Sequence, residues 1–127
     1  MKNQVILFCL VCIATIITPS LSYEFENEEN FDCEVLMKNE RLVKGLADCL
    51  TSDELECGNV MFSQVKKYAP EILETVCAKC TDQQKATFKK CTNLFMQSHH
   101  DDYEAIMKKM DPENKFRGPL EAFLAEP

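Results

Sequence analysis

The chain has 127 residues, a formal net charge of -7 and 8 cysteines. This length fits one domain, and the low counts of glycine (3) and proline (5) argue against a β-rich, turn-rich fold and against a disordered low-complexity chain. The acidic balance argues against a protein that coats nucleic acid or an anionic membrane, because either partner would repel it. Eight cysteines in so short a chain suggest an oxidising compartment, provided that they lie in the mature protein.

The first 22 residues have the pattern of a secretory signal peptide. A lysine precedes an apolar core from Val5 to Ile17, which is shorter than the roughly 20 residues that span a bilayer. Ser20 and Ser22 then occupy the small-residue positions of a cleavage site. A signal anchor is the alternative interpretation. We predict that residues 1–22 are removed, that residues 23–127 form a single helical domain, and that the product is secreted into the extracellular space.

In the first half of the predicted mature chain, the hydrophobic spacing is typical of helices. Residues 23–30 are acidic and irregular, and we expect a mobile arm there. Helical spacing begins over residues 31–36 and continues over 42–50, while residues 61–80 form the most periodic stretch. This last pattern runs through Pro70. Because an interior proline removes a helical hydrogen bond, we expect a kink or a break beside it.

The second half is predicted to hold the remaining helices. Thr81 and Gln84 have the spacing of a capping box, with Thr81 as the N-cap of a helix. A further amphipathic helix over 103–110 ends at Asp111–Pro112, and a last short helix is expected to begin at Pro119, a favoured first helical residue. No stretch has the alternation of a strand. The predicted fold class is therefore all-α, a compact bundle of about six short helices.

The cysteines are the most specific feature of the sequence. Cys9 and Cys12 lie in the predicted signal peptide, which leaves six in the mature chain: Cys33, Cys49, Cys57, Cys77, Cys80 and Cys91. A structural zinc site would need a second close pair of ligands, and the two histidines are adjacent rather than spaced. A redox CxxC motif normally follows a strand. The secretory signal therefore favours a structural disulfide framework, for which six cysteines allow 15 pairings.

No enzyme signature is present. The sequence lacks GxSxG, HExxH and P-loop motifs. A nucleophile pair between Cys91 and His99 or His100 is conceivable, but a solvated helix end beside an oxidised or buried cysteine is the simpler interpretation. We predict no catalytic residue, no metal site and no cofactor.

The cysteine spacing resembles that of the insect chemosensory protein family. The matching pattern is Cys49-x7-Cys57-x19-Cys77-x2-Cys80. Four further motifs are similar to the family's: NxRL at 39–42, CxKCxxxQK at 77–85, APEIL for LPDAL at 69–73 and KMDP for KYDP at 109–112. The resemblance covers roughly residues 31–116, most of the mature chain.

This resemblance implies a bundle of about six helices around an apolar channel, with local bridges Cys49–Cys57 and Cys77–Cys80. It also implies a carrier of small hydrophobic molecules, such as long-chain alcohols, esters, fatty acids and semiochemicals. The expected partner is such a ligand, with no nucleic acid, no stable membrane insertion and a monomeric state. We predict that the following residues line the channel: Leu42, Leu46, Val65, Ile72, Leu73, Val76, Phe95, Tyr103, Ile106 and Met110.

The size of the ligand follows from the free energy of binding. Micromolar affinity corresponds to about 8 kcal/mol, and association costs at least another ~4 kcal/mol. At about 0.8 kcal/mol per buried methylene, the sum requires about 15 methylenes. We therefore expect long-chain lipids to bind more tightly than small volatile odorants.

The chain departs from the family's pattern at several positions. Leu46 and Met110 stand where the family has tyrosine, and Tyr103 stands where it has tryptophan. Cys33 and Cys91 are additional cysteines, and both fall where the helical faces require an apolar residue. They form either a third bridge or two buried free thiols, and both alternatives stay open.

Two other interpretations of the protein remain. The six-cysteine insect odorant-binding proteins need a CxxxC pair and a Cys-x8-Cys end, and neither spacing occurs here. A secreted protein-interaction factor with a filled core and no lipid ligand is the alternative function, with residues 23–30 as its recognition segment. An internal cavity would favour the carrier over this factor.

Overall fold

A computed structural model describes residues 23–127, except residues 27 and 55. The predicted signal peptide lies outside these residues. The all-α prediction is confirmed, because the described part of the chain contains helices and no strand. The elements are the 3-10 turn η1 (Glu28–Asn30) and the helices α2 (Cys33–Lys38), α3 (Glu40–Thr51), α4 (Val60–Thr75), α5 (Asp82–Ser98), α6 (His100–Met110) and α7 (Arg117–Ala125). None of the described helices has the length and apolar character that would let it cross a membrane.

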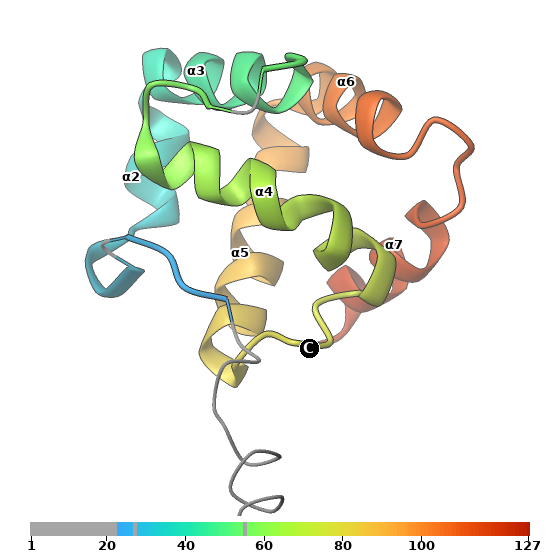
Figure 1. The fold of residues 1–127 in the computed structure, drawn as a ribbon. Helices are drawn as coiled ribbons and strands as arrows, with labels where there is room; N and C mark the ends of the chain where they lie inside the picture. Colours follow the sequence, from blue (N-terminus) through green and yellow to red (C-terminus); the bar gives the residue numbers. More distant parts are fainter. Residues whose placement is uncertain (1–22, 27, 55) are drawn as a thin grey trace, which may run out of the picture.

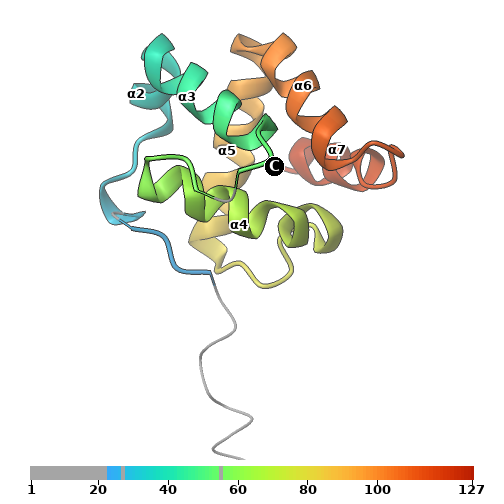
Figure 2. The same cartoon turned by 45° about the horizontal axis from the view of Figure 1, so that its top comes forward.

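Helix α5 runs through the middle of the bundle. It packs against α2, α6 and α7, while α3 packs against α2, α4 and α6. Helix α4 crosses in front of α5, and α2 and α7 lie on opposite sides (Figures 1 and 2). The helices thus turn their apolar faces toward a shared interior.

Side-chain caps start four of the helices. The predicted capping box of α5 is confirmed, because the hydroxyl of Thr81 accepts from the backbone N–H of Gln84 (3.1 Å) and the Gln84 side chain accepts from the backbone N–H of Thr81 (3.0 Å). Asp32, Asn39 and Asn59 cap α2, α3 and α4 in the same manner. These bonds pair backbone donors that a helix start otherwise leaves without a partner.

Helix α4 corrects two details of the prediction. It does not break at Pro70 but continues to Thr75, because its apolar face packs into the bundle on both sides of the proline and this packing outweighs local propensity. It also ends five residues earlier than the periodic pattern does. Val76 and Cys77 have φ angles of 54° and 63°, and this left-handed backbone turns the chain into the short loop that precedes α5.

The last helix depends on a buried aspartate. Helix α7 begins at Arg117, two residues before the predicted start at Pro119, and the proline is tolerated in the first turn because its missing N–H would have no helical partner there. Asp111 is 6% exposed. Its carboxylate accepts from the backbone N–H groups of Lys115 (2.7 Å), Phe116 (2.9 Å) and Arg117 (3.1 Å). Asp111 therefore fixes the turn that leads into α7.

The described cysteines are all bonded in pairs. Three disulfides join them: Cys49–Cys57, Cys77–Cys80 and Cys33–Cys91. The first two are the local bridges that the family resemblance implied. Of the two alternatives for the additional cysteines, the structure contains the bridge, with a Cα–Cα distance of 5.4 Å between residues 58 apart in sequence. This third bond is not local, because it joins α2 to the middle of α5.

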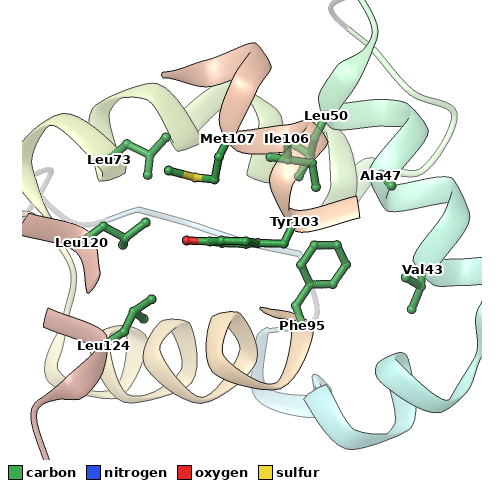
Figure 3. Close-up of a cluster of buried hydrophobic side chains, with 10 residues drawn as sticks. All are labelled: Val43, Ala47, Leu50, Leu73, Phe95, Tyr103, Ile106, Met107, Leu120 and Leu124. Carbon is green, nitrogen blue, oxygen red and sulfur yellow. The ribbon is translucent and has the colours of Figure 1, made fainter. Parts of the chain in front are cut away.

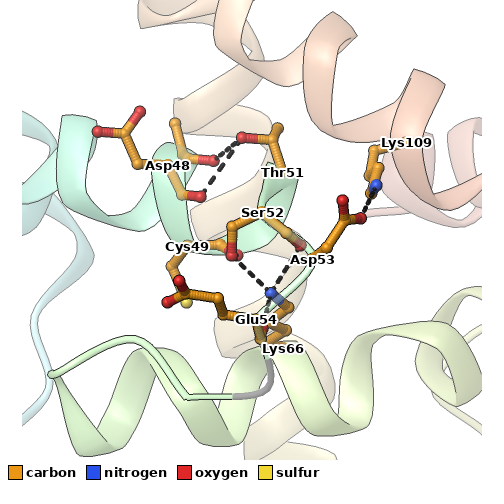
Figure 4. A network of polar contacts seen from close by, with 9 residues as sticks. Asp48, Cys49, Thr51, Ser52, Asp53, Glu54, Lys66 and Lys109 are labelled. Carbon is orange, nitrogen blue, oxygen red and sulfur yellow. Dashed lines mark hydrogen bonds and ion pairs between the residues drawn. The ribbon is translucent and has the colours of Figure 1, made fainter.

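Polar contacts hold the loop between α3 and α4 (Figure 4). The ammonium group of Lys66 donates to the carbonyl of Ser52 (2.8 Å), to its hydroxyl (2.8 Å) and to the carbonyl of Glu54. Lys109 forms an ion pair with Asp53. The loop is thereby attached both to α4 and to α6.

Removal of the long-range bridge should lower the stability substantially. In the chain-entropy model, a bond that closes a loop of about 59 residues stabilises a protein by about 4 kcal/mol. We expect the Cys33→Ala/Cys91→Ala double variant to lose a free energy of unfolding of this size in urea titrations, with α-helical circular dichroism retained. Two free thiols in the unreduced, folded wild-type protein, measured by mass spectrometry, would contradict the bridge.

The pairing of Asp111 should make stability depend on pH. Burial alone would raise the pKa of Asp111, but the three backbone donors and the charge of Arg117 together lower it below the ordinary value of 3.8. The carboxylate thus stabilises the fold above about pH 4, and this contribution is lost as the pH falls through the lower pKa of the folded state. We expect Asp111→Asn to lower the melting temperature at pH 7 and to differ less from wild type near pH 2. Asn at the exposed Asp48 is the matched control.

Candidate functional site

A cavity of about 250 Å³ lies between α4 and α5. One side of the cavity wall comes from α4: Met61, Phe62, Val65, Ala69, Ile72 and Leu73. Helix α5 contributes the facing surface: Gln84, Thr87, Phe88, Cys91, Thr92 and Phe95. Side chains of α2, α3, α6 and α7 complete the wall. The spacing of three and four residues within each set is that of a single helical face, so the cavity lies where the two faces meet.

The structure brings most of the predicted lining residues to this cavity. Eight of the ten lie on its wall: Leu46, Val65, Ile72, Leu73, Phe95, Tyr103, Ile106 and Met110. Leu42 and Val76 are not among the lining residues. Leu42 is 39% exposed, because the buried face of α3 is centred on Val43 and Ala47, and Val76 follows the end of α4, where the helical phase no longer applies.

Sequence reasoning missed other lining residues. Leu50, Phe62, Phe88, Met107 and Leu120 all lie on the wall. Four of them belong to the same apolar faces that the spacing identified, and only Phe62 lies beside such a face. The pattern identifies a buried face but not which part of it meets a cavity.

The wall is apolar apart from a few polar groups. Gln84 is 7% exposed, and both ends of its amide are bonded, because its oxygen belongs to the capping box and its nitrogen donates to the carbonyl of Tyr23 (2.6 Å). Glu28 is the one charged residue among the described lining residues. Such a surface favours an apolar occupant and offers little for acid–base chemistry.

The N-terminal segment was expected to be mobile, but it packs over one end of the cavity. Tyr23 is 7% exposed and lies against the ring of Tyr68 on α4, with 4.8 Å between the ring centroids. Phe25 meets the same ring edge-on at 5.4 Å and lines the cavity. The backbone N–H of Glu26 donates to the side chain of Gln64 (2.7 Å). The segment packs its aromatic rings against α4, while the side chains of Glu24 and Glu26 stay exposed.

The cysteines and histidines have structural partners. Cys91 is bonded to Cys33, so it carries no thiol for a Cys–His nucleophile pair. His99 stacks on Phe95 at 5.8 Å between centroids, and its Nε2 lies 3.1 Å from the carboxylate of Glu40. Among the described residues, no three His, Cys, Asp or Glu side chains gather as the ligands of a metal ion would.

Over the described residues, six α-helices, three disulfides and an apolar cavity define a small helical protein with room for an apolar ligand. The chain belongs to the insect pheromone-binding family A10/OS-D, whose family model matches residues 23–118. The family resemblance that the sequence motifs indicated is thereby confirmed.

Three relatives are similar at low identity. The allergen Tha p 1 of Thaumetopoea pityocampa is 26% identical over 115 residues, which cover 90% of this chain and 89% of the allergen. The ejaculatory bulb-specific protein 3 of Drosophila melanogaster is 26% identical over 98 residues, 74% of this chain and 76% of that protein. The putative odorant-binding protein A10 of the same species is 27% identical over 89 residues, 70% of this chain and 56% of that protein.

Loss of the Phe25 ring should open the covered end of the cavity. We expect a fluorescent apolar probe to dissociate severalfold faster from Phe25→Ala than from wild type in stopped-flow measurements, because water reaches the bound probe more easily. The exposed Glu24 on the same segment provides the control, Glu24→Ala, with an unchanged rate. Equal rates for wild type and Phe25→Ala would contradict a covering role for this segment.

Proposed function

We propose that the protein is a secreted carrier of small hydrophobic molecules, which it holds in the cavity between α4 and α5. The observation that carries this proposal is the cavity itself, which α2 to α7 line, almost throughout with apolar side chains. Family membership supports the same role, because the matching family is described as pheromone-binding and one relative as a putative odorant-binding protein.

The N-terminal sequence and the disulfides both support secretion. Residues 1–22 have the signal-peptide pattern, and the three disulfides require an oxidising compartment.

The protein works as a single domain over residues 23–127 and as a monomer. Among the described residues, the large exposed apolar ones are Val35, Leu42 and Val60, which come from three different helices, and scattered residues of this kind are usual on the surface of a monomer.

The cavity volume sharpens the expectation about ligand length. A volume of about 250 Å³ lies just below the usual range of ligand pockets, and at about 30 Å³ for each group the size of a water molecule it holds about eight such groups. The roughly 15 methylenes needed for micromolar affinity therefore require the cavity to widen. Four methionines line it, Met37, Met61, Met107 and Met110, and their flexible thioether side chains can adapt to a longer chain.

The alternative function, a protein-interaction factor, has less support. It called for a filled core and a free acidic segment. A cavity occupies the interior, and the acidic segment is seated against α4 and α5 through Tyr68 and Gln84. Both observations favour the carrier.

The carrier should bind fatty alcohols and fatty acids of twelve to eighteen carbons. We expect members of this series to displace a fluorescent apolar probe from the purified protein, with affinity rising with chain length until the cavity can widen no further. If no member of the series displaces the probe, the carrier function is wrong.

Filling the cavity should abolish this binding. Val65 lines the cavity from α4, so the larger ring in Val65→Phe would occupy ligand volume, and we expect at least a tenfold loss of affinity in the displacement assay. Val60 lies on the same helix but is 57% exposed and outside the cavity, so Val60→Phe is the matched control and should bind as wild type does. Equal affinities for both variants would place the ligand elsewhere.

A further inference from the structure

Tyr103 brings a polar group into the apolar cluster beside the cavity. The residue belongs to α6, is 4% exposed and lines the cavity. In Figure 3 the hydroxyl end of its ring points toward Leu120 and away from Phe95. Leu73, Met107 and Leu120 belong to the same buried cluster. Within the described part of the chain, this hydroxyl has no hydrogen-bond partner.

A buried hydroxyl without a partner destabilises the fold that contains it. Phenylalanine would fill the same space among these neighbours without that cost. Tyr103 lines the cavity but its hydroxyl is covered, so an occupant reaches it as the cavity widens, which the flexible Met107 side chain of the same cluster allows. A phenol both donates and accepts, which suits the oxygen of an alcohol, an aldehyde, a ketone or an ester.

The charges around Tyr103 disfavour an anionic ligand. The cation beside the ring is Arg117, with its Cζ 6.0 Å from the ring centroid, and Glu104 already binds both of its terminal nitrogens (3.2 and 2.8 Å). Glu121 on α7 also acts on the phenol, whose pKa is raised mainly by burial. Tyr103 therefore stays neutral, and a carboxylate buried here would lose its water without gaining an unpaired cation.

We propose that the Tyr103 hydroxyl is the hydrogen-bond anchor for a neutral oxygen of the ligand, and that it selects alcohols, carbonyl compounds and esters over carboxylates of the same length. The inference rests on the proposed carrier function. It assigns Tyr103 the role of choosing the head group, while the apolar wall accepts the chain.

The test uses three probes of similar size: 1-octanol, nonane and octanoate. Each displaces N-phenyl-1-naphthylamine from the disulfide-bonded mature protein at pH 7. We expect wild type to bind octanoate at least tenfold more weakly than 1-octanol. We expect Tyr103→Phe to lower the affinity for 1-octanol by roughly threefold to tenfold, the range of one hydrogen bond. The affinity for nonane should not change. Tyr68→Phe removes a hydroxyl outside the cavity and should change neither affinity.

Thermal unfolding of the ligand-free variant separates an anchor from a structural role. The melting temperature of Tyr103→Phe should equal or exceed that of wild type, because an unpaired buried hydroxyl is removed. A lower melting temperature, an equal loss for 1-octanol and nonane, unchanged binding of 1-octanol, or octanoate bound as tightly as 1-octanol would each overturn the inference. If wild type binds neither these probes nor any alcohol of twelve to eighteen carbons, the carrier function itself fails.

Discussion

A helix bundle with an internal cavity lacks some of the packing contacts that stabilise a filled core. In this protein the Cys33–Cys91 bridge is the interaction that compensates for them. An unfilled volume of about 250 Å³ costs on the order of 6 kcal/mol relative to a filled core. The bridge contributes about 4 kcal/mol in the chain-entropy model, which is of the same order. It ties α2 to the middle of α5, and Cys91 itself lies on the cavity wall. The covalent bond thus fixes α2 against α5 directly beside the cavity, so that one wall of the cavity keeps its position although the interior is not filled.

Gln84 shows how the covered end of the cavity depends on a single polar side chain. Its oxygen completes the cap of α5, and its nitrogen donates to the carbonyl of Tyr23, 61 residues away in sequence. A buried amide is stable only when its groups are paired, and here each bond serves a different element. The start of α5 and the seating of the N-terminal segment are consequently coupled.

The helices could be predicted from the sequence because their apolar faces and caps are local signals. Thr81 and Gln84 suffice to predict the start of α5, and the pattern of three and four residues predicts the face of each helix. The end of α4 could not be predicted, because Val76 and Cys77 continue the apolar spacing although their backbone is left-handed. The N-terminal segment was misjudged because its carboxylates dominate its composition, whereas its aromatic rings determine its packing.

The cavity could be predicted only in part, because a filled core and a cavity wall have the same sequence pattern. Eight of the ten predicted positions reach the wall, but whether a buried side chain meets a neighbour or a cavity depends on the distances between helices. These distances follow from the whole bundle, including the long-range bridge, and no local spacing encodes them.

A polar group on an apolar face gives information that the apolar residues cannot give. Tyr103 stands where the family resemblance expects tryptophan. An indole only donates a hydrogen bond, whereas a phenol donates and accepts. The hydroxyl of Tyr103 is buried and has no partner among the described residues, so the apolar contacts of the ring give no reason for its presence. Under the proposed anchoring role, the exchange gives an occupant a group that pairs with either a hydroxyl or a carbonyl oxygen, where an indole would only donate.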